Sequence, residues 1–214
     1  ANDIIWYLSL QDLERIGSYF LKNLYPSYKY ISVGGNCLEN PRYVRALIGT
    51  PIDKILENEN LNDNDRIISG DVLSGSTTLL ENSLNYFDDI VSVIHQNYNR
   101  DFLGWMGPGF DKFTLSGTFA SSFVEFIKPK IDTKINGSVR SIIPMGNWDK
   151  VLPMDILSEF LIKSILCKDI DMMEKLGIYE CDPEDFALCS LACQSKVEVS
   201  KIVKEGLDLI ELEG

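Results

Sequence analysis

The sequence contains a single histidine, His95, among 214 residues. A metal site built from several histidines is therefore excluded, and a catalytic nucleophile would have only one candidate histidine base. We interpret His95, which follows an apolar segment, as a structural residue. Cysteines are also few, odd in number and irregularly spaced: Cys37, Cys167, Cys181, Cys189 and Cys193. No basic segment followed by an apolar run opens the chain, so this pattern indicates reduced thiols in a cytosolic setting.

Long apolar runs and a surplus of basic residues are missing as well. The longest apolar stretches, such as Ile4–Leu8, fall far short of the roughly 18–20 residues that a membrane span needs. The net charge is −12, with 20 Lys and Arg against 32 Asp and Glu. Such a balance excludes extended contact with a nucleic-acid backbone. Gly104–Gly109 lacks the lysine and hydroxyl residue of a phosphate loop.

The first part of the chain combines strand and helix patterns, and we predict an α+β domain over residues 1–98. Ser9 is a predicted N-cap, and the helix after it carries a stripe of apolar residues at three- and four-residue spacing. Thr50 is a predicted N-cap for a second, short helix with Pro51 at its first position. Strands are expected at residues 4–7, 29–33, 43–48, 66–70 and 90–94.

The rest of the chain divides into two predicted segments. Residues 99–150 are rich in glycine, proline and aromatic residues, and we expect a connector with little regular structure. Residues 151–214 have helical periodicity and form a predicted helical domain. Helix starts are expected at Pro153–Asp155, at Asp169 and at Asp182–Asp185, and a last helix is expected over Val197–Leu212.

Several of these segments resemble a known family. The order strand, Gly34-Gly35, Pro41, strand and Gly49 over residues 29–75 is similar to the soluble-ligand-binding β-grasp (SLBB) domain. Arg66–Gly75 resembles a stretch of the A subunit of the Na+-translocating NADH:quinone reductase (Nqr), and so do Pro144–Asp155 and the tail from Asp185. The larger N-terminal portion of that family has no counterpart in this sequence, so we expect the chain to be part of a longer protein.

The resemblance implies a fold and a function. The expected fold class is α+β, with an SLBB-like β-grasp core at about residues 29–78 followed by a ferredoxin-like helical domain without iron–sulfur clusters. The expected role is that of a peripheral subunit on the cytoplasmic side of the bacterial inner membrane, which supports assembly and quinone reduction coupled to Na+ export. Its expected partners are the other Nqr subunits, especially the quinone-handling membrane subunit. Quinone itself is a candidate ligand.

The expectation about clusters depends on four positions. The related C subunit of the Rnf complex carries ferredoxin-type cysteine runs, and Cys189 and Cys193 match the last two positions of such a run. The two earlier positions are occupied by Pro183 and Phe186, which cannot bind iron, and two thiolates cannot hold a four-cysteine cluster. We therefore expect no cofactor, no metal and no catalytic residue in this chain; flavins, iron–sulfur centres and quinone belong to the complex as a whole.

The expected interface lies in the connector. Its aromatic residues are followed by a basic stretch, a combination that suits a partner surface beside a cytoplasmic membrane. The candidate docking residues are Trp105, Met106, Phe110, Phe113, Lys128 and Lys130. The alternative interpretation of the aromatic residues is a plain hydrophobic core. Two rival functions also stay open: a free-standing β-grasp module that binds a soluble ligand, and an iron–sulfur electron carrier, which the cysteine spacing disfavours.

Overall fold

The chain folds as two compact units, residues 1–96 and residues 97–214. The computed structural model describes residues 6, 8–57, 59–99, 102–104, 106–113, 115, 117–123, 133–135 and 137–213. The strand expected at residues 4–7 lies outside the described residues apart from Trp6, which is in no strand.

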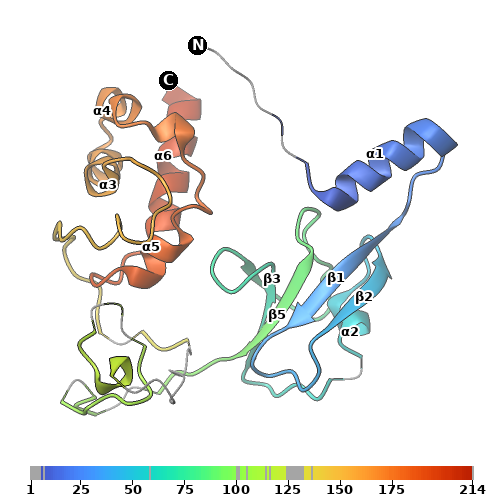
Figure 1. The fold of residues 1–214 in the computed structure, drawn as a ribbon, viewed down its shortest axis with the longest axis horizontal. Helices are drawn as coiled ribbons and strands as arrows, with labels where there is room; N and C mark the ends of the chain where they lie inside the picture. The colour runs from blue at the N-terminus through green and yellow to red at the C-terminus, as the bar shows by residue number, and fades with distance from the viewer. Residues whose placement is uncertain are drawn as a thin grey trace. The chain divides into compact units, whose positions relative to one another are not determined.

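The first unit is built on a five-stranded sheet with the order β2-β1-β5-β3-β4 (Figure 1). β1 runs parallel to β5, and the other neighbouring pairs are antiparallel. The predicted strands at 29–33, 43–48, 66–70 and 90–94 are confirmed to within two residues, whereas the short strand β4 was not expected. The strands are β1 Tyr28–Gly34, β2 Arg42–Leu47, β3 Asp65–Ser69, β4 Ser76–Thr78 and β5 Ile90–His95.

One face of this sheet forms the core of the first unit. Ile31 and Val33 of β1 are buried there together with Val91 and Val93 of β5, and α2 (Ile52–Ile55) packs against them. Side chains two residues apart in a strand point to the same face, which explains why these residues meet.

The prediction of Thr50 as the N-cap of α2 was wrong. Pro51 occupies the cap position, and no side chain makes the cap hydrogen bond. The reason is tertiary: the N–H groups of Ile52 and Asp53 donate to the carbonyls of Asn82 and Leu80, so a neighbouring loop takes the place of a capping side chain.

Helix α1 (Leu10–Lys22) begins as predicted after Ser9, whose side chain accepts a hydrogen bond from the N–H of Asp12. It contacts the sheet through polar residues. The side-chain amide of Gln11 bonds both the N–H (2.8 Å) and the carbonyl (3.0 Å) of Tyr30, and Arg15, one helical turn further on, is buried. The predicted apolar stripe of α1 is exposed to solvent and includes Leu10, Leu13, Ile16, Phe20 and Leu21.

The second unit has a helical core. Its helices are α3 Ser158–Cys167, α4 Ile170–Lys175, α5 Ala187–Ala192 and α6 Val199–Glu213. Among the residues described here, α3 packs against α4 and α6, and α5 also packs against α6 (Figure 1). Trp148 and Leu152, from the boundary between the expected connector and the helical domain, are buried in this core.

Two of the predicted helix starts were right and two came too early. Asp169 caps α4 as expected, and α6 matches its prediction to within two residues. α3 begins at Ser158 rather than near Pro153. Before it, residues 148–152 form a turn in which the Val151 and Leu152 N–H groups bond the Trp148 carbonyl. α5 begins at Ala187.

A turn precedes α5. Asp182 and Asp185 use their carboxylates within the preceding turn: Asp182 accepts from the N–H of Glu184 (2.9 Å), and Asp185 accepts from the N–H of Asp182 (3.1 Å). This reciprocal pattern is that of a capping box, so the predicted start signal is present. The backbone bonds that follow, from the Asp185 N–H to the Asp182 carbonyl and from the Ala187 N–H to the Glu184 carbonyl, are turn bonds, and regular helix begins only after them. Within the described ranges, no helix has both the length and the apolar character needed to cross a bilayer.

Candidate functional site

The docking residues predicted from sequence can be placed only in part. Trp105, Lys128 and Lys130 lie outside the described residues. The side chains of Met106, Phe110 and Phe113 are 65%, 48% and 44% exposed. The expectation that apolar side chains of this segment are exposed is thus confirmed for three residues, and the interpretation as a plain core fails for them. Their role in docking stays a prediction.

The apolar stripe of α1 is a second exposed apolar surface, which was not expected from the sequence. An amphipathic helix normally turns its apolar face inward. Here Gln11 bonds to strand β1, Arg15 is buried, and the stripe is open to solvent. Contiguous apolar surface of this kind is characteristic of interaction sites. The amphipathic pattern was recognisable in the sequence, but the direction in which the stripe points was not.

Cys189 and Cys193 are buried in the helical core beside Phe186, whose side chain is fully buried. Burial, together with the nearby charge of Asp149, raises the pKa of Cys189 to about 11, so its thiol stays protonated at neutral pH. The thiolate, not the thiol, binds iron. Both cysteines are small buried residues of this core.

We expect the purified chain to stay colourless after anaerobic incubation with iron and sulfide. Phe186 fills the core at a position where a cluster ligand would be needed, and two cysteines are too few. Visible absorption spectra and iron analysis before and after desalting test this. A stoichiometric cluster would contradict the prediction and restore the electron-carrier interpretation.

The adjacent acids Asp88 and Asp89 have hydrogen-bond and ion-pair partners within the first unit. Asp88 accepts from the Ser69 hydroxyl (2.6 Å) and the Asn85 amide (2.9 Å). Asp89 forms an ion pair (3.0 Å) with the ammonium of Lys29, which is almost completely buried and also donates to two backbone carbonyls. These contacts close the loop before β5, so both acids have a structural role.

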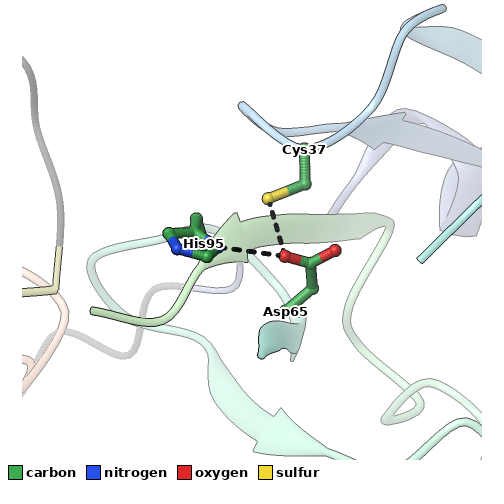
Figure 2. A group of neighbouring side chains, drawn as sticks. All are labelled: Cys37, Asp65 and His95. Atoms are coloured by element: carbon green, nitrogen blue, oxygen red, sulfur yellow. Dashed lines mark hydrogen bonds and ion pairs between the residues drawn. The ribbon is translucent and has the colours of Figure 1, made fainter. Parts of the chain in front are cut away.

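A cluster of Cys37, Asp65 and His95 lies at one end of the sheet (Figure 2). Cys37 comes from the loop after β1, Asp65 is the first residue of β3, and His95 is the last residue of β5. Asp65 and His95 are direct partners in the β3–β5 ladder. Both other side chains contact the same carboxylate oxygen, Asp65 Oδ1: Cys37 Sγ at 3.3 Å and His95 Nδ1 at 3.3 Å.

The electrostatics of the cluster follow from these contacts. Burial of Asp65 opposes its ionisation, but hydrogen bonds from the Asn62 backbone, Cys37 and His95 outweigh burial and lower its pKa. Burial, the hydrogen bond to Asp65 and the charge of Asp65 raise the pKa of the Cys37 thiol to about 11. From sequence, Cys37 and His95 were interpreted separately, and Asp65 was not a candidate. The only sequence signal was that all three border predicted strands.

A small cavity in the second unit is lined by residues including Arg140, Trp148, Glu159 and Ser195. Its volume of about 100 Å³ is well below the roughly 300 Å³ at which small-molecule sites begin.

The mixed sheet and the helical unit define an α+β protein, and comparison with known families agrees with the resemblance seen in the sequence. The family model described as "NQRA C-terminal domain", an SLBB-type family, matches residues 30–79. This range covers β1 to β4 apart from the first two residues of β1.

Similarity to individual proteins extends over the whole chain. The chain is 37% identical to the A subunit of the Na(+)-translocating NADH-quinone reductase of Rhodopirellula baltica. The aligned region covers 100% of this chain and 47% of that protein. Identity to the A subunits of Vibrio anguillarum and Neisseria meningitidis serogroup B is 35% and 32%, again over 100% of this chain and 48% of each relative. The resemblance to the A subunit is confirmed, and the chain spans about half the length of these relatives.

Proposed function

We propose that this chain acts as part of the A subunit of a Na+-translocating NADH:quinone oxidoreductase. The observation that carries the proposal is similarity to such A subunits along the entire chain, including the helical unit. A free-standing β-grasp module has no need of that second unit. The mixed five-stranded sheet, with α2 on its buried face, supports a β-grasp assignment of the first unit. The ferredoxin-like character of the helical unit belongs to the same proposal.

In this role the chain supports assembly of the complex and carries no electrons itself. It also supports quinone reduction coupled to Na+ export, and it lies at the cytoplasmic side of the membrane. The supporting observation is the burial of Cys189 and Cys193, whose thiols are enclosed by the helical core. No catalytic residue and no flavin or iron–sulfur site is assigned to the chain.

The proposed docking segment is the one expected from sequence, with Met106, Phe110 and Phe113 as its exposed apolar side chains. Its proposed partner is the quinone-handling membrane subunit. The basic residues Lys128 and Lys130 belong to the same proposal, because a membrane surface attracts positive charge. The exposed stripe of α1 is a competing docking surface, and the two surfaces make separable predictions.

We expect Phe110→Asp to lower recovery of the chain with the membrane complex at least about tenfold, since a charge buried in an interface costs several kcal/mol. The measurement is affinity purification from membranes of a host that supplies the remaining subunits. Leu21→Asp tests the α1 stripe in the same assay. The free energy of unfolding of each variant should stay within about 0.5 kcal/mol of the parent, because both side chains are exposed.

Leu79→Asp is the matched control, since Leu79 is exposed in the first unit and belongs to neither surface. A loss confined to Leu21→Asp would move the interface from the aromatic segment to α1. Equal losses for all three variants would contradict both surfaces. If the parent chain itself does not purify with partner subunits, the proposed function fails, and a soluble-ligand module becomes the better interpretation.

A further inference from the structure

We propose that Cys37, Asp65 and His95 form a binding site for a single Zn²⁺-like divalent ion. This inference goes beyond the proposed function and departs from the sequence-based expectation that the chain binds no metal. It rests on the three side chains that the tertiary structure brings to one end of the sheet (Figure 2).

The geometry fits a metal without a large rearrangement. The sulfur, nitrogen and oxygen ligand atoms all lie within 4.8 Å of one another, with two of the separations at 3.3 Å. Zinc bonds of about 2.0–2.3 Å at tetrahedral angles place ligand atoms about 3.4–3.6 Å apart. The separation between the Cys37 and His95 ligand atoms, which is at most 4.8 Å, is the one that must shorten, and a turn of the exposed His95 ring can shorten it.

The donor types select the ion. One thiolate, one imidazole and one carboxylate suit Zn²⁺ and its neighbours in the first transition series. Ca²⁺ and Mg²⁺ prefer oxygen donors alone, and a cysteine would not serve them. When the ion binds, the Sγ–H proton of Cys37 leaves to solvent, and the resulting thiolate is neutralised by the metal.

The backbone holds the three ligands in place. The β3–β5 ladder pairs Asp65 with His95, and the N–H of Cys37 bonds the Val93 carbonyl at 3.4 Å. The other oxygen of Asp65, Oδ2, accepts from the backbone (2.8 Å) and side-chain (3.3 Å) nitrogens of Asn62. These contacts aim Oδ1 at Cys37 and His95, as hydrogen bonds around a metal ligand commonly do.

The ligands differ in burial, which suits a metal site that ions must reach from solvent. The Asp65 side chain is 2% exposed, whereas the His95 side chain is 52% exposed. An ion can reach the cluster past His95, and a water molecule can complete its coordination. The side-chain oxygen of Asn36 lies 3.4 Å from Cys37 Sγ and is a further candidate for the fourth position.

The arrangement does not suit nucleophilic catalysis. An activated cysteine needs a histidine that takes the thiol proton, with an acid behind the histidine. Here Asp65 lies between the two and contacts both. Its negative charge keeps the Cys37 thiol protonated unless a cation is present. The remaining alternative is a hydrogen-bond network that merely closes the end of the sheet.

Titration of the reduced chain with Co²⁺, followed by absorbance, tests the proposal. We expect one Co²⁺ per chain, a thiolate-to-cobalt charge-transfer band in the near ultraviolet, and stoichiometric displacement by Zn²⁺. Cys37→Ser should abolish the band. His95→Gln and Asp65→Asn should keep the band but lower the affinity at least about tenfold. Circular dichroism of each variant shows whether the fold is retained.

Cys167→Ser is the control, because Cys167 is the exposed cysteine and belongs to no such cluster in the described part of the chain. It should bind Co²⁺ like the parent. Loss of the band in this variant, or its persistence in Cys37→Ser, would show adventitious binding and overturn the proposal. Failure of the parent to bind would leave the hydrogen-bond network as the correct interpretation. If Cys37→Ser does not fold, the two affinity variants decide.

Discussion

Replacement of Gly35 by alanine is expected to destabilise the first unit by at least about 3 kcal/mol. Gly35 has a φ of +135°, a conformation that residues other than glycine rarely adopt. A Cβ at this position would lie 1.9 Å from the carbonyl oxygen and 2.6 Å from the nitrogen of Val93. Both atoms belong to the backbone of the central strand β5, so no side-chain movement relieves the clash. Urea denaturation, followed by hydrogen exchange of the β1 and β5 amides, measures the effect.

Gly34 supplies a matched control in the adjacent position. A Cβ added to Gly34 meets no atom within 4 Å, and its φ is not in the left-handed region. We expect Gly34→Ala to change the free energy of unfolding by less than about 1 kcal/mol. A loss for Gly35→Ala as small as the one expected for Gly34→Ala would show that the loop tolerates a side chain at Gly35, and that the close approach to β5 is not required.

Replacement of Phe186 by alanine is expected to cost about 3–5 kcal/mol and to unfold much of the second unit. The Phe186 ring is completely buried among core residues that include Leu161, Cys189 and Val203. Removal of the ring leaves a cavity in the core. The surrounding helices hold the walls of this cavity apart, so the remaining side chains replace few of the lost packing contacts. Thermal unfolding and hydrogen exchange of the α3 and α6 amides report on this core.

Leu188→Ala is the control for this prediction, because Leu188 lies two residues away in the sequence and is exposed. It should cost less than about 1 kcal/mol. Equal effects at the two positions would mean that the loss came from the α5 region in general rather than from the core. Phe186→Leu, which keeps most of the apolar volume, should fall between the two alanine variants.

The elements that could be predicted from sequence are those with strong local signals. Ser9 as an N-cap, Asp169 as an N-cap and the four apolar strands depend on side chains within a few residues of one another. The errors came where distant groups decided the outcome. Thr50 lost its cap role because the carbonyls of Asn82 and Leu80 bind the first N–H groups of α2.

The candidate functional residues likewise fall into those that the sequence predicted and those that only the structure revealed. The sequence predicted that at least one of Trp105, Met106, Phe110 and Phe113 is exposed, because aromatic residues beside a basic stretch suit a partner surface. Met106, Phe110 and Phe113 are exposed. It did not predict the cluster of Cys37, Asp65 and His95, because the register between β3 and β5 and the loop after β1 bring these residues together. The spacing of these residues along the chain does not predict the strand register.

The sequence by itself determined the α+β class, most strand and helix positions, the lack of a long apolar span and the resemblance to the A subunit of the reductase. Each depends on composition or on short-range periodicity. Only the tertiary structure decided that α1 contacts the sheet through Gln11 and leaves its apolar stripe exposed. The physical reason is that burial and ligand geometry depend on which distant segments pair. Those pairings form together, through backbone hydrogen bonds and packing that no single segment specifies.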